Sequence, residues 1–432
     1  MRVTFITIVV CFIALSYIEG QTQLSGELRA RPELRYGYKE LPDSASKPAL
    51  LVSQRSRLNF IIKKEKYSVG FSIQDVRVWG DEQMYTSTGV SGDMASIDLK
   101  EAWFAYQVKK DFNIKAGRQE WKYGDQRLLG ARNWNQNGLS YDALLLSYKG
   151  LFRCDAGFSY NNEKEITFQD FYATGKIRTL NFLYLQKEFK EKLNIYGLYI
   201  LSGMQNPRRA ETVFLKNTLG GSATFKNDLV ELNGNGYFQT GLNKDSTKVS
   251  AFLLSGYASL FIGPLKLTLG TDIISGQNAI CTDSTYLKTD HRFDNLYGAR
   301  HSFNGDMDLF SNLGSATGGG GLNDIYLNVD SKVNEKLAVR VAYHYFSLQN
   351  NVLDPESLTS PYYAMDPYLG SEVDLKLNYK IGEDISFEIG YSILKGSESF
   401  YTIRGNKAEN AIPAQWVYLM ITFKPVFFST EK

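Results

Sequence analysis

Arginines recur at alternate positions in two short stretches near the start of the chain. They are Arg29, Arg31, Arg35, Arg55 and Arg57. In an extended strand, residues an even number apart share one face, so each stretch predicts a row of guanidinium groups. A guanidinium offers paired planar donors that match a carboxylate, which favours anion binding. Glu27 and Glu33 share the face of the first row, so a self-neutralising ladder of ion pairs explains the pattern equally well.

Groups that could carry covalent or metal chemistry are sparse. The three histidines, His291, His301 and His344, lie in no zinc-protease motif, and the chain has no serine nucleophile elbow or phosphate-binding loop. Cys154 and Cys281 have no neighbouring cysteine that would suggest a metal or redox pair, and we expect no disulfide between them. We therefore expect no catalysis, no metal and no cofactor.

The elements that must position the arginines are strands. Apolar residues alternate with polar ones over 372–379, 385–393 and 337–345, so each run has one apolar and one polar face. About eighteen runs of this kind follow one another, each near the length that a tilted membrane strand needs. The predicted strands are 24–37, 51–64, 66–79, 96–109, 111–121, 139–149, 151–161, 176–188, 191–202, 211–226, 228–241, 249–261, 263–275, 321–332, 334–348, 370–381, 382–395 and 414–426.

The connections between these strands alternate in length. Very short turns, such as 64–66, 110–111, 149–150 and 263–264, alternate with longer loops, among them 122–138 and 276–320. Short turns at one end and long loops at the other are typical of an outer-membrane β-barrel, with turns in the periplasm and loops outside the cell. An even strand count then places both termini in the periplasm.

Composition and the N-terminus agree with this fold class, a single-domain, all-β transmembrane antiparallel barrel. The net charge of +2 in 432 residues is too small for a nucleic-acid binder. Arg2, an apolar run over 5–15 and small residues before Gln21 predict a signal peptide at 1–20, followed by the barrel at 21–432. The competing interpretation is a soluble propeller or sandwich, but no blade-length repeat is present.

If the strands cross a membrane, the parity of each one assigns its charges. A Lys or Arg on the lipid face at mid-bilayer costs about 2 to 4 kcal/mol, so charged residues should face the lumen. The residues predicted to line the pore and set its selectivity are Arg29, Arg31, Arg35, Arg55, Arg57, Lys266, Arg340 and Lys376. Arg118 is an exception, because strict alternation puts it on the same face as Ile114 and Ala116. A β-bulge, or a position above the apolar band, would account for it.

Two dense segments resemble a known family. The segments are 117–130 (GRQEWKYGDQRLLG) and 296–310 (LYGARHSFNGDMDLF). They are similar to the hallmark motifs of the alginate-export family of outer-membrane porins, whose fold is an eighteen-stranded barrel. The resemblance implies a narrow, electropositive pore that passes an anionic uronate polysaccharide outward.

The resemblance also points to particular residues. Its motif positions here are Gly117, Arg118, Gln119, Tyr123, Gly124, Arg127, Gly130 and Asp142. The motif has two interpretations: it lines the pore, or it shapes the loop that follows. In the long loop, Arg300, His301, Asp306 and Asp308 are candidates for a gate, or they hold the loop's own fold.

The sequence thus predicts a passive outer-membrane channel of a Gram-negative cell for anionic solutes, an acidic polysaccharide or oligosaccharide in particular. A general or sugar-specific uptake porin is the alternative, and a non-conducting structural or adhesive barrel is a third. The expected partners are outer-membrane lipid, an anionic saccharide, the barrel-assembly machinery and periplasmic export or degradation proteins, with no nucleic acid.

Overall fold

The computed structural model describes residues 20–80, 97–168, 170–172, 175–206, 208–355, 357, 363–406, 409 and 411–430. The predicted signal peptide lies outside these residues except for its last position, Gly20. No helix in the described ranges combines the length and the hydropathy needed to span a bilayer.

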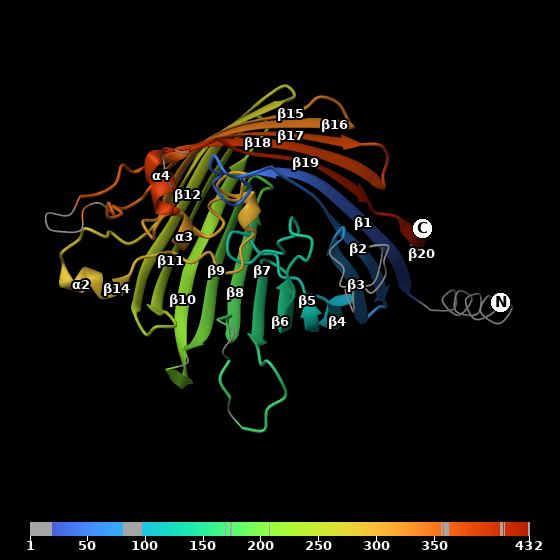
Figure 1. Cartoon of the computed structure of the whole chain (residues 1–432). Coiled ribbons are helices and arrows are strands. Elements are labelled where there is room, and N and C mark those ends of the chain that lie inside the picture. Colours follow the sequence, from blue (N-terminus) through green and yellow to red (C-terminus); the bar gives the residue numbers. More distant parts are fainter. Residues whose placement is uncertain are drawn as a thin grey trace.

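Eighteen long antiparallel strands close into a barrel, because β1 pairs with β2 on one side and with β19 on the other (Figure 1). The strands are β1 (Gln21–Tyr36), β2 (Ala49–Lys63), β3 (Tyr67–Val78), β4 (Ile97–Lys109), β5 (Phe112–Gln119), β6 (Tyr141–Lys149), β7 (Arg153–Tyr160), β8 (Thr179–Phe189), β9 (Leu193–Asn206), β10 (Arg209–Lys226), β11 (Val230–Leu242), β12 (Lys248–Ile262), β13 (Leu265–Ile274), β15 (Leu322–Lys332), β16 (Leu337–Ser347), β17 (Tyr368–Lys380), β18 (Ile385–Gly396) and β19 (Ala414–Phe423). The predicted fold class is confirmed.

Short elements occupy the connections and the C-terminal end. They are α2 (Ser284–Leu287), β14 (Thr289–Asp290), the 3₁₀ turn η1 (Arg300–Ser302), α3 (Leu313–Ala316), α4 (Glu398–Ile403) and β20 (Val426–Ser429). β20 continues the pairing of β1 beyond β19, and the backbone N–H of Thr430 donates to the carbonyl oxygen of Thr22. Both ends of the described barrel therefore lie at the end with the short turns.

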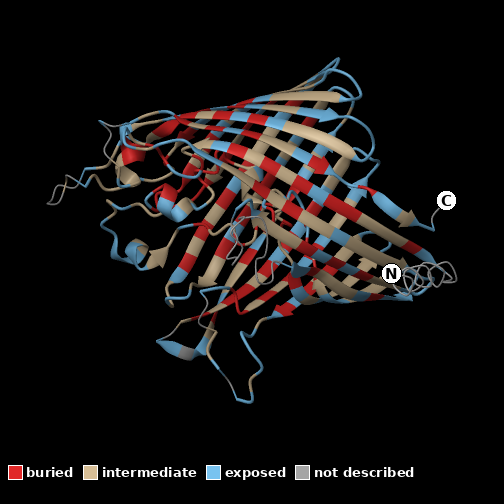
Figure 2. Ribbon diagram, turned by 45° about the vertical axis from the view of Figure 1, so that its right-hand side comes forward, coloured by how far each residue is buried: buried red, intermediate tan, exposed pale blue. Residues whose placement is uncertain are grey.

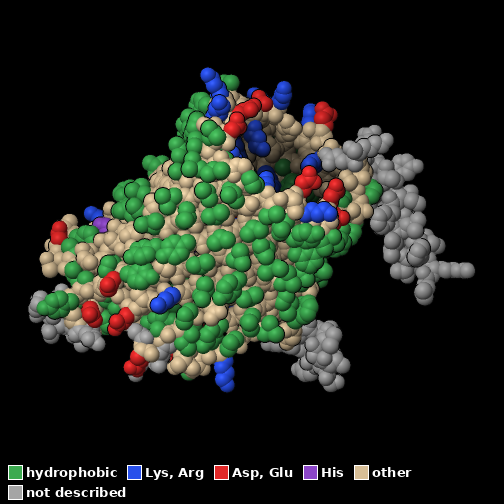
Figure 3. All heavy atoms as spheres, turned by 90° about the horizontal axis from the view of Figure 1, so that it is seen from above, with side chains coloured by type: hydrophobic (Ala, Val, Ile, Leu, Met, Phe, Trp, Pro, Cys, Tyr) green, Lys and Arg blue, Asp and Glu red, His purple; other side chains and the backbone are tan. Residues whose placement is uncertain are grey.

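Each strand has one face in the lumen and one on the outer wall. On β1, Arg29 and Arg31 are buried inside, whereas Leu28 and Leu34 are each 46% exposed outside. The burial bands in Figure 2 repeat this alternation around the barrel, and the outer wall seen in Figure 3 is mostly hydrophobic. The inside–outside assignment from parity is correct at these positions.

Strand boundaries agree with the sequence-based ones to within a few residues, with one clear difference at a loop. The uncharged stretch from Val249 to Leu265 forms a hairpin of β12 and β13, as predicted. The loop predicted between strands 191–202 and 211–226 is much shorter, because Gly203 and Gln205 pair with Leu215 and Val213 and extend the β9–β10 ladder.

The loop end of the barrel is filled by two inward-folded connections, 120–140 and 275–321. Both contribute to a hydrophobic core in the lumen, which includes Trp121, Leu129, Leu296 and Phe310. Leu129 forms an isolated bridge with Tyr297, so the two loops are joined by backbone hydrogen bonds as well as by packing. The lumen is therefore narrowed by these segments and not by the barrel wall alone.

Candidate pore constriction

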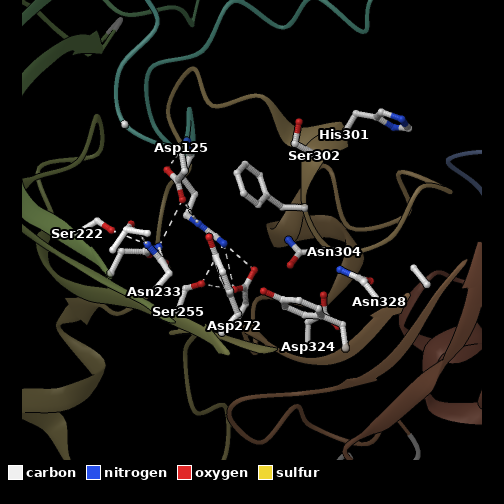
Figure 4. Close-up of a pocket in the computed structure, with 18 of the residues that line it drawn as sticks. Asp125, Ser222, Asn233, Ser255, Asp272, His301, Ser302, Asn304, Asp324 and Asn328 are labelled. Atoms are coloured by element: carbon white, nitrogen blue, oxygen red, sulfur yellow. Dashed lines mark hydrogen bonds and ion pairs between the residues drawn. The ribbon is translucent and has the colours of Figure 1, made fainter. Parts of the chain in front are cut away.

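A cavity of about 500 Å³ lies between the two loops and the wall formed by β8–β17. Loop residues such as Arg127, Phe303 and Asn304 form one side. Strand residues such as Asn233 and Asp272 form the other, and Figure 4 shows these side chains converging on the hollow. This cavity is the candidate path for a solute.

Arg127 fixes loop 120–140 to the barrel wall. Its guanidinium donates to both carboxylate oxygens of Asp272 on β13, at 2.7 and 3.1 Å, and to the Ser255 hydroxyl at 3.0 Å. Asp125 and the ring of Phe303 contact the same guanidinium. Burial alone would lower the pKa of Arg127, but Asp272 and Asp125 raise it, so the side chain stays charged. The motif arginine is thus a loop anchor that faces the cavity.

The predicted row of arginines on β1 lies under the same loop. Arg29 donates to the side chain of Gln136 at 2.8 Å and to the carbonyl oxygens of Asn133, Trp134 and Asn135 at 2.7 to 3.1 Å. Only 4% of Arg29 is exposed. This guanidinium supplies donors to three backbone carbonyls of the loop, of which that of Trp134 also accepts from Arg31.

The other arginines of the cluster bind the loop or neighbouring acids. Arg31 lies over the Trp134 ring and pairs with Glu33, and the fully buried Arg55 bonds Asn133, Gln136 and Glu27. Arg57 donates to Gln74, and Arg35 pairs with Glu33 while remaining partly exposed. All five face the lumen as predicted, but in this structure Arg29, Arg31 and Arg55 hold the loop and do not line the open cavity. Their effect on ion selectivity stays a prediction.

The remaining predicted cations differ in how firmly they are paired. Lys376 lines the cavity and pairs with Asp306 of the loop at 2.8 Å. Lys266 pairs with Glu231 at 3.2 Å and lies outside this cavity. Arg340 lines the cavity with its side chain 42% exposed, and its ion pair with Asp330 is long, at 4.0 Å. Arg340 is thus the most loosely held of these three.

Two of the gate candidates connect loop 275–321 to its neighbours: His301 contacts loop 120–140, and Asp308 contacts the loop after β1. His301 stacks on Trp134 with ring centroids 3.9 Å apart, and its Nδ1 lies 3.0 Å from Asp308. Tyr38, in the loop after β1, donates its hydroxyl to Asp308 at 2.5 Å. Within the described residues, the Arg300 guanidinium donates to the carbonyls of Ser311 and Leu296 in its own loop, which supports a structural role for that residue.

The backbone of the same loop also donates hydrogen bonds to buried acidic residues of the wall. The backbone N–H groups of Asp306 and Met307 donate to Asp374 and Glu372 on β17, at 3.4 and 2.8 Å. His344 on β16 bonds Asp324 at 2.9 Å. Loop 275–321 therefore contacts β17, and through Asp294 and His291 it also bonds to β10, β11 and β12. Loop 120–140 contacts β1–β3 and β12–β13.

The family motif has one outward-facing position. Arg118 follows strict alternation onto the outer face, where it forms a two-bond ion pair with Asp142 of β6 at 2.9 and 2.8 Å. Gly117 has φ +111°, and a Cβ there would lie 2.3 Å from the carbonyl oxygen of Ala102. The charge on the outer wall is therefore neutralised by its neighbour and is not turned inward.

The other motif residues shape the loop. Gln119 is buried and donates to the carbonyl of Ala143, and Tyr123 packs on the Phe182 ring. Gly124 lines the cavity, and Gly130 lies so close to the second loop that a Cβ would be 2.8 Å from the Ala299 nitrogen. These contacts support the interpretation that the motif builds the inward-folded loop.

Only charged residues were assigned to the lumen from the sequence, so the uncharged polar residues of the wall were not predicted. Asn233, Asn235, Tyr237 and Gln239 share one parity on β11, opposite exposed Leu232 and Phe238. The period-2 pattern that assigned the arginines to the lumen would have assigned these residues too.

Acidification should release the second loop. Burial would raise the pKa values of Asp306 and Asp308, but neighbouring groups hold both below their ordinary value. Lys376 and His301 lower the pKa of Asp306, and His301 and Tyr38 lower that of Asp308. Because the pKa of each carboxyl is lower in the docked loop, the ionised carboxylates stabilise that loop at any pH above their ordinary pKa, which is about 4. This stabilisation is lost as the pH falls through the lowered pKa. Single-channel conductance should rise below about pH 4. Asp306→Asn should show the larger conductance already at pH 7, whereas Asp43→Asn, in an exposed turn, should match the wild type.

Comparisons with known proteins agree with this geometry. Solved barrels from Pseudomonas aeruginosa share the fold: OccK9 (OpdG) has 12% identity and a TM-score of 0.58, covering 94% of this chain and 98% of its own. OccK3 (OpdO) has 11% identity and a TM-score of 0.59, covering 94% and 96%. No curated protein sequence matches the chain. The family model described as alginate export matches residues 21–413. The chain therefore belongs to the alginate export family and is an outer-membrane β-barrel channel.

Proposed function

We propose that this channel passes saccharides through the cavity between its loops and the β8–β17 wall. The observation that carries the proposal is the chemistry of that wall, which alternates amides, hydroxyls and tyrosines. They include Gln186, Asn194, Tyr196, Ser222, Asn233, Asn235, Tyr257 and Asn328. Amides and hydroxyls both donate and accept hydrogen bonds, as sugar hydroxyls do. Tyrosine adds an apolar face beside a polar tip.

The charge of the cargo is the finer part of the proposal. Five aspartates line the cavity (Asp125, Asp272, Asp306, Asp324 and Asp374), with Arg127, Arg340 and Lys376 as the Lys and Arg groups. This balance is less positive than the arginine cluster led us to expect. A uronate-type cargo is the second candidate, favoured by the loosely paired Arg340, which can offer a guanidinium to a passing carboxylate.

The orientation is part of the same proposal. Both ends of the described barrel lie at the short-turn end, and we place that end in the periplasm because short turns typically lie there. Loops 120–140 and 275–321 then narrow the path from the outside.

Block of ion current by oligosaccharides tests the cargo. In planar bilayers, a neutral hexasaccharide should reduce the current of the wild type, and replacing Asn233 and Asn235 together by Ala should weaken this block by about tenfold. Asn217, on the outer wall of β10, bonds the Tyr199 hydroxyl there, so Asn217→Ala is the control and should leave block unchanged. Failure of neutral and acidic sugars alike to reduce the current would contradict the proposal.

Arg340 separates the two cargo candidates. Arg340→Gln should weaken block by a uronate hexamer severalfold and leave block by the neutral hexamer unchanged if acidic sugars are the cargo. Equal block by both probes in the variant and in the wild type would favour a neutral-sugar porin.

A further inference from the structure

One stretch of the outer wall carries charged side chains within its strands. Asp75 and Arg77 share the outer face of β3 with the exposed Ile73, and Arg77 donates two hydrogen bonds to Asp75 at 2.6 and 2.9 Å. Arg118 on β5 pairs in the same two-bond way with Asp142 on β6. The strands concerned are neighbours, since β20, β1 and β2 to β6 follow one another around the barrel (Figure 1). We call this stretch of wall the charged sector.

The ion pair of Arg118 lies at membrane depth. Arg118 follows Phe112, the first residue of β5 at the turn end, by six positions. At about 3.4 Å per residue and a strand tilt of about 40°, it lies roughly 16 Å above the turns, within an apolar band of about 25 Å. Asp142 is its direct cross-strand partner, and both side chains remain exposed. By contrast, Lys187 and Lys395 lie within two positions of the ends of β8 and β18. Lipid chains alone are therefore a poor environment for this part of the wall.

A hollow of about 420 Å³ lies beside the two ion pairs. Asp75 is part of its lining, and the carbonyl of Leu99, which pairs with Ile73 in the hollow, accepts a hydrogen bond from Arg118 at 3.2 Å. Ile97, which also lines the hollow, is 71% exposed. The other apolar outer-wall residues of its lining are Leu28, Leu58, Phe423, Pro425 and Phe427. Apolar and charged groups thus form one continuous surface.

The charges of this surface complement a second copy of the same surface. Two arginines, Arg77 and Arg118, are matched by two aspartates, Asp75 and Asp142, so these four residues offer no excess of cations to a lipid phosphate. In an interface with two-fold symmetry, residue i contacts residue j of the partner and j contacts i, so each arginine meets an aspartate of the other copy. The exposed Trp79 at the end of β3 adds an aromatic group of the kind enriched in interface cores.

We propose that the charged sector is an interface between two copies of this chain, related by a two-fold axis along the membrane normal. Such an axis keeps each residue at its own depth, so Arg118 of one copy meets Asp142 of the other at the same height. The apolar hollow supplies the centre of the interface, and the ion pairs are shielded there from lipid. Each barrel keeps its own lumen, so the interface is independent of the cargo.

Native mass spectrometry of the full chain, extracted in a mild zwitterionic detergent, tests the interface. We expect a dimer for the wild type. Replacing Arg118 and Asp142 together by Met leaves no unpaired charge in the wall, so the barrel should stay folded, but the dissociation constant of the dimer should rise at least about tenfold. The control replaces Tyr199 by Phe and Asn217 by Leu, which removes a hydrogen-bonded pair from the outer wall of β9 and β10. This control should change the dissociation constant less than about twofold.

Cross-linking in isolated outer membranes is the second measurement. In a background with Cys154 and Cys281 replaced by Ser, Ile97→Cys should give a dimer with a short thiol cross-linker. Val341→Cys, on the exposed outer face of β16, should not. In planar bilayers the Arg118 and Asp142 double variant should keep the size of a single conductance step, because the interface lies outside the lumen.

Four outcomes would overturn the inference. They are a wild type that is monomeric in both detergent and membranes, equal weakening by the sector variant and its control, equal cross-linking at positions 97 and 341, and bound lipopolysaccharide that the double substitution releases from a protein monomeric throughout. The last outcome would assign the charged sector to a lipid headgroup.

Discussion

A channel in which Arg127 is replaced by Met should open far more often than the wild type. The substitution removes three hydrogen bonds between loop 120–140 and the barrel wall and leaves Asp272 buried without its cation. Removing one partner of a buried ion pair costs about 3 to 5 kcal/mol. Since about 1.4 kcal/mol is a factor of ten in an equilibrium constant, the docked loop should lose at least two orders of magnitude in relative population. Single-channel recording should show a larger open probability or a larger conductance.

Arg118→Met is the matched control for this experiment. Arg118 makes an ion pair of the same two-bond geometry with Asp142, but it lies on the outer wall, where both side chains are well exposed. The hydrogen bonds of Arg118 go to Asp142 and to the carbonyl of Leu99 on the wall and not to loop 120–140, so this variant should conduct as the wild type does. Equal behaviour of the two variants would show that Arg127 does not hold the loop in place.

Replacing Arg29 by Met should make the loop accessible to protease. Arg29 supplies four hydrogen bonds to residues 133–136, and each bond to a charged donor contributes about 1.5 to 3 kcal/mol before losses from non-additivity. Without them, three loop carbonyls are left buried without this donor. Limited proteolysis of the folded barrel should then cleave within 130–137 at a rate at least about tenfold higher than in the wild type.

Arg35→Met provides the comparison, because Arg35 lies on the same strand and the same face. Its hydrogen bond goes to Glu33, and its side chain is 31% exposed. Resistance to protease should be retained in this variant. If both variants are cleaved alike, the barrel as a whole has been destabilised and the assignment of Arg29 to the loop is wrong.

The barrel could be predicted from the sequence because its rules are local. On β18, Ile385, Phe387 and Ile389 alternate with polar residues, and a lipid-facing charge is so costly that parity alone assigns each side chain. Arg118 departs from the cost rule but follows strict alternation onto the outer face, and its partner Asp142 was identified only in the structure. The connection lengths then gave the two ends of the barrel.

The arrangement inside the barrel could not be predicted in the same way. Parity places Arg29 in the lumen, but it contains no information about what covers the side chain there. The bond between Arg127 and Asp272 joins residues 145 positions apart, and that between Arg29 and Gln136 joins residues 107 apart. Such contacts depend on how a long loop folds into the lumen, which involves neither periodicity nor turn chemistry. This is why the sequence did not show that Arg29, Arg31 and Arg55 hold the loop, while their effect on ion selectivity stays a prediction.

Single-channel recording of the purified wild-type chain beside Arg127→Met tests the central claim, a water-filled lumen narrowed by inward-folded loops. We expect discrete conductance steps in both proteins, with longer or larger openings in the variant and reduction of the current by added hexasaccharide. Folded protein that inserts into the bilayer and shows no steps in either form would contradict the account and would make the barrel a non-conducting one.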